Sequence, residues 1–255
     1  MNLSLVPISK IVKEPYSSIL GYPKATKDEL AKRYSELKKL GITAVSFQGE
    51  TILNNIHVLG KGYVGVVVLS KLRKKNVALK IRRTDSSRSE MKSEAKLLKI
   101  ANKAGVGPKL VDSSKNFIIM KYVEGKKITD WVRELKGRGS AAKLKSVVRQ
   151  ILEDCHTLDK IHLDHGELSY IHKHAIVGKS PCIIDFESAS TNRRTSNVTS
   201  ATQSIFIGSA LSNIVKNIIK IPDKKKMIGL LRKYKQDQSR ENFDEIIKIL
   251  GLDKS

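Results

Sequence analysis

The chain has 255 residues, of which 40% are hydrophobic and 29% are charged. This balance is typical of a globular protein and excludes a largely disordered chain. No apolar run reaches the roughly 18 to 20 residues that span a bilayer, and the first residues lack a secretory leader pattern. Two cysteines, Cys155 and Cys182, are too few for a disulfide framework or a cysteine-rich zinc site. We therefore expect a cytoplasmic protein with no membrane partner.

The charge is strongly unbalanced, with 48 Lys and Arg against 25 Asp and Glu, a net charge of +23. Such an excess favours a polyanionic partner, RNA or DNA above all, free or in a ribonucleoprotein. Tyrosine and phenylalanine are too few to indicate a surface on which bases stack. A well-hydrated basic surface that only keeps the protein soluble is the alternative, and both interpretations stay open.

The first fifty residues are predicted to form a helical extension that precedes the main fold. Thr26 and Glu29 have the spacing of a capping box, in which each side chain bonds the other's backbone N–H. Gly41 ends the helix. Between them, apolar side chains recur at helical spacing, at Leu30, Tyr34, Leu37 and Leu40.

A β-rich region follows, from about residue 44 to residue 80. Its apolar runs predict three antiparallel strands, at Ile56–Leu59, Val64–Leu69 and Asn76–Lys80. We expect a helix next, capped by Ser87 or Ser89 and ending near Gly105. A further short strand is predicted at Phe117–Met120.

The chain changes to a helical pattern after Gly125. Apolar residues from Leu144 to Leu158 recur every three or four positions, which indicates an amphipathic helix. Ile176–Val177 and Cys182–Ile184 flank a turn at Gly178 and predict a hairpin. Residues after about Ser200 are predicted to be helical, with one buried helix over Ile205–Ile221.

Gly60, Gly62 and Gly65 fit the pattern G-x-G-x-x-G. A strand follows this motif, whereas a helix follows it in dinucleotide-binding folds. Glycines in a β-hairpin let backbone N–H groups approach phosphates without interference from a Cβ. An ordinary hairpin with a bulge is the alternative that the motif alone leaves open.

Lys80 ends the segment Val-Ala-Leu-Lys, which matches the Val-Ala-Ile-Lys strand of protein kinases. In that setting the lysine contacts the α- and β-phosphates of ATP. Its ammonium group needs a carboxylate partner on the following helix. We favour Glu94 over Glu90, because Glu94 precedes the apolar run that packs the helix on the sheet.

The segment from His165 to His172 reads His-Gly-Glu-Leu-Ser-Tyr-Ile-His, and Asp185-Phe-Glu follows eighteen residues after Glu167. The loop resembles the His-Gly-Asp-Leu-Ser-x-x-Asn loop of RIO-type kinases and of the small kinase in the threonylcarbamoyl-adenosine tRNA-modification complex. The whole chain is similar to an archaeal group of predicted Ser/Thr protein kinases. The resemblance covers about residues 53 to 190.

The resemblance implies a role for each matching residue. Glu167 orients the acceptor hydroxyl, Ser169 contacts the γ-phosphate, and Asp185 binds Mg²⁺, whose preferred ligands are hard carboxylate oxygens. His172 stands where the family has a metal-binding Asn and is therefore the expected second metal residue beside Asp185, although a neutral imidazole is a poor Mg²⁺ ligand. His165 and Asp164 are expected to brace the loop.

The connection between the predicted lobes lies at Met120–Val123. Backbone groups of Lys121 and Val123 are expected to bond adenine, with Met120 at the back of that pocket. No Ala-Pro-Glu follows Asp185, which favours a reduced kinase. Further on, Thr195 and Ser196 follow two arginines, as either an autophosphorylation site or an exposed polar loop.

Together these features predict an α+β, bilobal protein kinase-like fold with a reduced helical C-lobe. The expected division is an N-terminal extension over residues 1–50, an N-lobe over 51–124 and a C-lobe over 125–255. The N-lobe is expected to be small, antiparallel and β-rich.

The predicted function is ATP- and Mg²⁺-dependent Ser/Thr phosphorylation of the chain itself or of a basic or ribonucleoprotein-associated substrate, in ribosome or tRNA maturation. One alternative is a nucleotide-binding pseudokinase that acts as a scaffold on RNA. A second alternative is a small-molecule kinase, which the basic charge and the lack of an acidic insertion disfavour.

Overall fold

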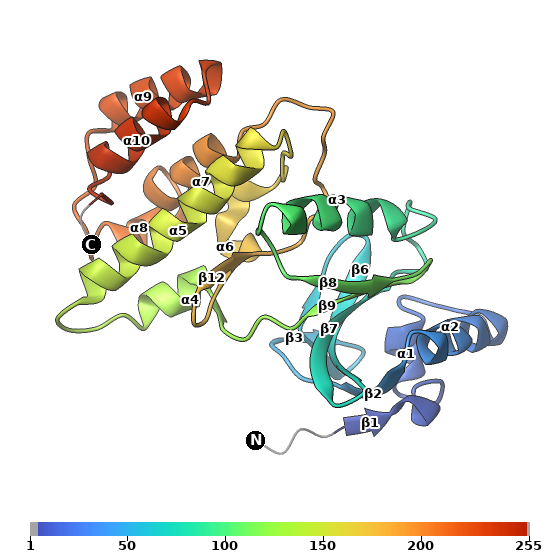
Figure 1. The fold of residues 1–255 in the computed structure, drawn as a ribbon. Helices are drawn as coiled ribbons and strands as arrows, with labels where there is room; N and C mark the ends of the chain where they lie inside the picture. Colours follow the sequence, from blue (N-terminus) through green and yellow to red (C-terminus); the bar gives the residue numbers. More distant parts are fainter. Residues whose placement is uncertain (1–4, 254–255) are drawn as a thin grey trace. The chain divides into compact units, whose positions relative to one another are not determined.

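The computed structural model describes residues 5–253, which divide into two compact units (Figure 1). The first comprises Met1–Lys99 and Pro108–Tyr122, and the second comprises Ile100–Gly107 and Val123–Ser255. The first contains the main antiparallel sheet and the second is mostly helical. This α+β architecture agrees with the predicted bilobal, kinase-like fold.

The sheet of the first unit has the strand order β1-β2-β6-β7-β9-β8, and β5 pairs with β6 in addition. Each pairing is antiparallel, and β6 and β7 form the longest ladder, from Gly65 opposite Arg82 to Leu72 opposite Lys75. The strands are β1 (Leu5–Pro7), β2 (Ile42–Ser46), β5 (Gly60–Lys61), β6 (Gly65–Leu72), β7 (Lys75–Arg82), β8 (Leu110–Ser113) and β9 (Phe117–Lys121).

The predicted strand at Ile56–Leu59 pairs differently from expectation. It forms β4 (Ile56–Val58) and joins β3 (Thr51–Leu53) in a separate two-stranded hairpin. Asn54 and Asn55 turn this hairpin with positive φ angles of 48° and 60°, which asparagine tolerates better than most residues. The sequence interpretation overlooked this paired asparagine turn.

Residues 5–50 belong to the first unit, and several of their side chains pack on one face of its sheet. They contribute β1 and β2, and three short or medium helices, η1 (Ile8–Lys10), α1 (Ser17–Leu20) and α2 (Lys27–Lys39). Alternate residues of β7 and β9 share one apolar cluster with side chains from this segment, among them Ile11, Ile19, Leu20 and Leu37. The segment therefore completes the core of the first unit.

Helix α2 begins as predicted. Thr26 Oγ1 accepts a hydrogen bond from the Glu29 N–H at 3.2 Å, and the Glu29 carboxylate accepts one from the Thr26 N–H at 2.8 Å. Buried Arg33 then fastens the helix, because its Nη1 donates to the carbonyl oxygens of Leu20 and Arg82, both at 2.7 Å. Burial lowers the pKa of the Arg33 guanidinium to about 10, which leaves it charged at neutral pH.

Helix α3 (Lys92–Lys103) begins later than predicted, so Ser87 and Ser89 are not its cap. The chain just before it is held by the sheet instead. The Met91 N–H donates to the Lys115 carbonyl oxygen at 2.9 Å, and the Arg88 carbonyl oxygen accepts from Arg82 Nη1 at 3.2 Å. These bonds delay the start of the helix until residue 92.

The second unit packs helices around a small sheet of β10 (Lys126–Lys127), β11 (Ala175–Val177) and β12 (Pro181–Ile183). The predicted long helix and the predicted hairpin are both present. Its helices are α4 (Ile128–Arg133), α5 (Ser140–Lys160), α6 (Ile171–His174), α7 (Asn197–Phe206), α8 (Ala210–Val215), α9 (Lys224–Gln236) and α10 (Arg240–Ile249), with the 3₁₀ helix η2 (Leu168–Tyr170). Helices α5 and α7 lie side by side (Figure 1).

The prediction of one continuous helix over Ile205–Ile221 is wrong. Helix α7 ends at Phe206, and α8 begins at Ala210 with its own capping box between Ser209 and Ser212. Gly208 makes the turn with a φ of +72°. Among the helices of residues 5–253, none combines the length and the apolar character needed to cross a membrane.

We predict that Arg33→Met lowers the free energy of unfolding by about 2–4 kcal/mol, because one buried and one partly buried carbonyl oxygen lose their charged donor. Lys32→Ala is the matched control. Lys32 pairs with Asp28 at the exposed surface of the same helix, so its loss changes stability by less than about 0.5 kcal/mol. Urea unfolding measures both, and equal effects would contradict the anchoring role of Arg33.

Candidate active site

The glycine motif forms a tight hairpin in the first unit. β5 pairs with the start of β6, and the Gly62 N–H donates to the Gly65 carbonyl oxygen at 2.8 Å across the turn. A Cβ on Gly65 would lie 2.9 Å from both the Ile81 carbonyl oxygen and Lys80 Cγ, so only glycine fits there. Gly60, in contrast, has open space around its Cα. The hairpin is therefore packed directly beside Lys80.

Lys80 and Glu94 form a buried ion pair in the first unit. Lys80 Nζ lies 2.8 Å from Glu94 Oε1, and both side chains are only 4% exposed. Strand β7 carries the lysine, and the first turn of α3 carries the glutamate. The alternative carboxylate, Glu90, pairs instead with exposed Lys92 at 3.2 Å. A buried pair of this kind holds the ammonium group in one place, which an exposed pair does not.

The predicted adenine-binding residues follow along the chain. Met120 is half-buried and Lys121 is exposed at the end of β9, and Val123 comes just after the strand. The Lys121 N–H donates to the Lys109 carbonyl oxygen at 2.8 Å. The group that Lys121 can offer adenine is therefore its carbonyl oxygen, and the role of all three residues stays a prediction.

In the second unit, a buried polar network fixes the loop that begins at Asp164. Asp159 of α5 accepts hydrogen bonds from the backbone N–H groups of Asn197 and Val198, at 3.0 and 3.1 Å, and so caps α7. It also accepts from Asn197 Nδ2 at 2.8 Å and from the Tyr234 hydroxyl at 3.0 Å. Burial raises the pKa of Asp159 while these bonds oppose the rise.

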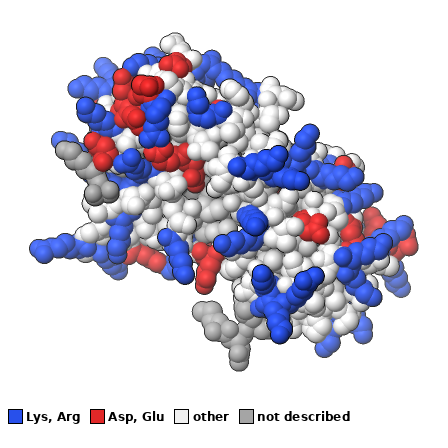
Figure 2. Space-filling model, viewed as in Figure 1, with Lys and Arg blue, Asp and Glu red and all other residues white. Residues whose placement is uncertain are grey.

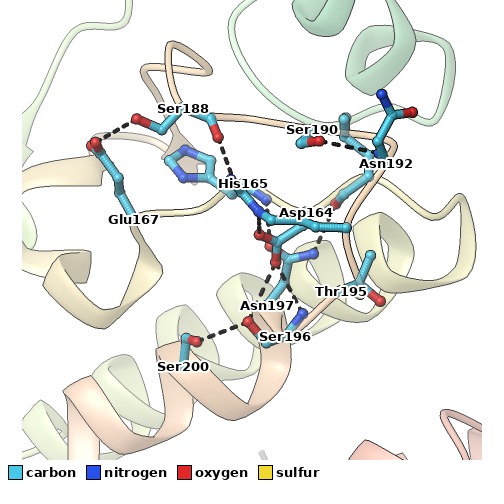
Figure 3. A network of polar contacts seen from close by, with 12 residues as sticks. Asp164, His165, Glu167, Ser188, Ser190, Asn192, Thr195, Ser196, Asn197 and Ser200 are labelled. Carbon is cyan, nitrogen blue, oxygen red and sulfur yellow. Dashed lines mark hydrogen bonds and ion pairs between the residues drawn. The ribbon is translucent and has the colours of Figure 1, made fainter.

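Asn197, held by Asp159, in turn bonds the backbone of the loop around Asp164. Its Oδ1 accepts a hydrogen bond from the His165 N–H at 2.8 Å, and its Nδ2 donates to the Leu163 carbonyl oxygen at 2.8 Å. Figure 3 shows Asn197 beneath His165 and Asp164. One side chain at the start of α7 thus holds the backbone on both sides of Asp164.

His165 braces the loop from inside the unit. Its side chain is fully buried, and its Nε2 donates to the Ile184 carbonyl oxygen at 3.0 Å. Its ring packs against Phe186 and His174, with ring centroids 5.0 and 5.3 Å apart. Burial lowers the pKa of His165 to about 4, so the ring is neutral at physiological pH. This environment suits a brace and not a proton carrier.

Asp164 and Arg193 tie the loop to the segment that follows Asp185. Asp164 and Ser190 exchange two backbone hydrogen bonds of 2.9 and 2.8 Å, and the Asp164 carboxylate contacts Arg193 Nε. Arg193 Nη2 donates to the Ser188 carbonyl oxygen at 2.5 Å. Gly166, with a φ of +90°, lies so close to this guanidinium that a Cβ would overlap it.

Three side chains of the second unit form a compact group that can hold a metal ion. Glu167, His174 and Asp185 each present a ligand atom, and these atoms all lie within 4.8 Å of one another. Asp185 adopts a φ of +69°, a strained conformation for a residue with a Cβ. Strain of this kind gathers at functional sites, where the surrounding structure holds it.

His174 is oriented to bind a cation. Its Nε2 lies 3.0 Å from Glu167 Oε2, and a carboxylate only accepts, so Nε2 carries the hydrogen. Burial lowers the pKa of His174, although Asp185 and Glu167 oppose the change, so the ring is neutral at physiological pH. Its Nδ1 is then a buried lone pair without a hydrogen-bond partner, and it lies 4.0 Å from Asp185 Oδ2. Two acceptors at this separation favour a cation between them.

The donor set fits a divalent cation. The Glu167 and Asp185 carboxylates suit Mg²⁺, whose preferred ligands are oxygen atoms. An imidazole nitrogen suits Mn²⁺ and later transition metals better than Mg²⁺. We therefore expect the group to bind Mg²⁺ and to bind Mn²⁺ more tightly.

The sequence prediction placed His172 with Asp185, and the structure places His174 there instead. Residues two apart on a helix point about 200° from each other, so α6 can turn only one of these histidines inward. His172 faces Tyr170, with ring centroids 6.2 Å apart. His174 immediately precedes β11. Its position relative to that predicted strand is the sequence signal that could have identified it.

Two further predictions concern hydroxyl side chains. Ser169 is exposed on η2 and does not belong to the three-residue group, so its contact with phosphate stays a prediction. Thr195 is buried and donates to Gln238 Oε1 at 2.9 Å, whereas an exposed polar loop or an acceptor site was expected.

A model of the RIO domain matches residues 66–198, just over half of the chain. The chain belongs to the RIO domain family. This family is a group of atypical, kinase-like proteins that use ATP, so the coarse assignment to the kinase class holds. No curated protein matches the chain. The matched segment of this RIO protein includes Lys80, Glu94 and the three-residue group, and it begins just after the glycine hairpin.

We predict that His174→Asn weakens Mn²⁺ binding about tenfold or more, because the one nitrogen ligand of the group is lost. Mg²⁺ binding changes less, so the preference for Mn²⁺ narrows. Calorimetric titration of the nucleotide-free RIO protein with each ion measures this.

His172→Asn is the matched control and leaves both affinities at the wild-type values. A loss of Mn²⁺ affinity in His172→Asn that equals the loss in His174→Asn would contradict the geometry of α6.

Proposed function

We propose that this RIO protein is an ATP-dependent Ser/Thr protein kinase that acts on itself or on a protein substrate. The observation that carries the proposal is the group of Glu167, His174 and Asp185, in a chain that also holds the buried Lys80–Glu94 pair. Phosphoryl transfer needs aligned oxygens, a carboxylate for the acceptor and a cation for the developing charge, and these residues can supply each part. Residues 51–124 would bind the nucleotide, and residues 125–255 would carry the transfer chemistry.

In this proposal Lys80 contacts the α- and β-phosphates, and Glu94 keeps its ammonium group in position. Gly60, Gly62 and Gly65 allow the hairpin backbone to approach the phosphates. The Lys121 carbonyl and the Val123 backbone bond adenine beside Met120. Support comes from the buried ion pair and from the tight packing of Gly65 on Lys80.

Glu167 is proposed to orient the acceptor hydroxyl and to take its proton. Its side chain is 30% exposed, so an acceptor can reach it, and His174 holds one of its oxygens. Ser169, two residues further on, is proposed to contact the γ-phosphate. Asp185 and His174 would hold the ion, which supplies neutralising charge for the phosphates.

We predict that the wild-type protein transfers phosphate from ATP in the presence of Mg²⁺, and does so faster with Mn²⁺. Asp185→Ala abolishes transfer, because the ion loses a carboxylate ligand. Glu167→Gln slows transfer about 10²- to 10⁴-fold, the usual contribution of a general base. Labelled ATP with dephosphorylated casein as a generic acceptor measures both.

Glu94→Gln and Glu90→Gln form the matched pair for the nucleotide site. Glu94→Gln weakens ATP binding and slows transfer, whereas Glu90→Gln behaves as the wild type, since Glu90 pairs only with Lys92 at the surface. Tight ATP binding without any transfer would instead establish a pseudokinase scaffold.

We also propose an RNA or ribonucleoprotein partner. Lys and Arg side chains are spread over much of the face seen in Figure 2, and the net charge of +23 favours a polyanion. A ribonucleoprotein-bound substrate in ribosome or tRNA maturation fits this surface.

We predict that a fluorescent single-stranded RNA binds the protein at low salt. Its association constant falls about 10³-fold or more between 50 and 200 mM KCl, because several phosphate contacts release counterions. No binding at low salt would show that the charge serves solubility alone.

A further inference from the structure

Both carboxylate oxygens of Glu167 are already bonded within the chain. His174 Nε2 lies 3.0 Å from Oε2, and the Ser188 hydroxyl donates to Oε1 at 2.6 Å (Figure 3). Ser188 lies three residues after Asp185 and is partly exposed. The Ser188 hydroxyl thus bonds the same Glu167 carboxylate that is proposed to orient an acceptor hydroxyl.

A Ser or Thr acceptor must bring its hydroxyl within hydrogen-bond reach of the general base, at about 2.6–3.2 Å. The Ser188 hydroxyl meets this requirement without any other molecule. His174 bonds Glu167 Oε2, and the Ser188 hydroxyl bonds the other oxygen, Oε1. A substrate hydroxyl that is to bond Oε1 therefore has to displace the Ser188 hydroxyl.

We propose that Ser188 is a phosphate acceptor in its own chain, so that the protein autophosphorylates at this position. The inference rests on the proposed kinase function and names its first substrate. In the step, the Ser188 oxygen bonds to the γ-phosphorus of ATP, and the bond from this phosphorus to the β,γ-bridging oxygen breaks. ADP leaves with that electron pair, and the hydroxyl proton passes to Glu167 Oε1.

The neighbouring hydroxyls are bonded elsewhere. Ser190 Oγ accepts from the Asn192 N–H, Thr195 Oγ1 donates to Gln238, and Ser196 Oγ donates to Asp164. Among residues 186–200 of the described chain, Ser188 is the residue whose hydroxyl donates to Glu167. The segment Arg193–Ser196 therefore contributes a guanidinium group next to Ser188. Its own hydroxyl groups are not the acceptor in this proposal.

Arg193 carries that guanidinium group. Its Nη2 donates to the Ser188 carbonyl oxygen at 2.5 Å, so a phosphate on Ser188 has a guanidinium close by. The same phosphate would lie beside the Glu167 carboxylate, near Asp185. Its negative charge would repel the triphosphate of a second ATP, so the reaction limits itself.

The first experiment incubates the wild type, Ser188→Ala, Ser190→Ala and Glu167→Gln with ATP and Mg²⁺ and maps phosphosites by mass spectrometry. We expect phosphoserine at 188 in the wild type and in Ser190→Ala, and none at that position in Glu167→Gln. Transfer to casein with Ser188 unmodified would overturn the inference and leave the kinase proposal standing. Absence of transfer to any acceptor would overturn both.

A second arm tests the same-chain step by mixing the wild-type protein with isotope-labelled, inactive Asp185→Ala, whose Ser188 is intact. The Asp185→Ala chain should stay unmodified, and the wild-type rate per molecule should not depend on protein concentration. Modification of the Asp185→Ala chain would overturn the intramolecular step. Loss of casein transfer in Ser188→Ala, with no phosphoserine 188 in the wild type, would assign Ser188 to the positioning of Glu167.

A third arm needs no turnover and compares Ser188→Glu with Ser188→Gln, which has similar size and no charge. A fluorescent ATP analogue should bind Ser188→Glu several-fold more weakly than Ser188→Gln. Equal affinities of the two variants would overturn the self-limiting part of the inference.

Discussion

The arrangement of the candidate active site depends on one buried side chain, Asp159. Its carboxylate caps the start of α7 and orients Asn197, which in turn holds the backbone of the loop around Asp164. A carboxyl group in the protein interior needs hydrogen-bond partners around it, and four donors surround this one. The loop that carries Glu167 is thereby fixed from the helical core and not from the surface.

Further contacts hold the side chains of the candidate site and the segments that carry them. His165 bonds the end of β12 and packs against His174, and Arg193 joins Asp164 to the chain that follows Asp185. Each of these side chains contacts a member of the candidate site or a residue next to one. Burial lowers the pKa of His165 and of His174, so both rings are neutral at physiological pH. The charged groups among Glu167, His174 and Asp185 are then the two carboxylates.

Much of the fold could be predicted from the sequence, because short-range patterns determine it. The capping box at Thr26 and Glu29, the long helix ending at Lys160 and the hairpin around Gly178 all have local signals, and all are present. The start of α3 could not be predicted, since bonds to the turn between β8 and β9 and to the Arg82 side chain of β7 hold the chain before it. The cover that the first fifty residues give the sheet depends on tertiary packing in the same way. The pairing of Lys80 with Glu94 could be predicted from the apolar run that follows Glu94. His174 was missed because the loop motif that resembles the family ends at His172. The contact between Asp159 and Asn197 has no short sequence motif, because the two residues are 38 positions apart in the chain.

The placement of residues 5–46 has a consequence for how the RIO segment can be handled and compared. A fragment limited to residues 66–198 would lack β2, and β6 would become an open strand edge. It would also uncover a row of valine and isoleucine side chains on β6 and β7. Such a fragment would be prone to aggregate, so the segment that the family match detects is smaller than the unit that shares one core.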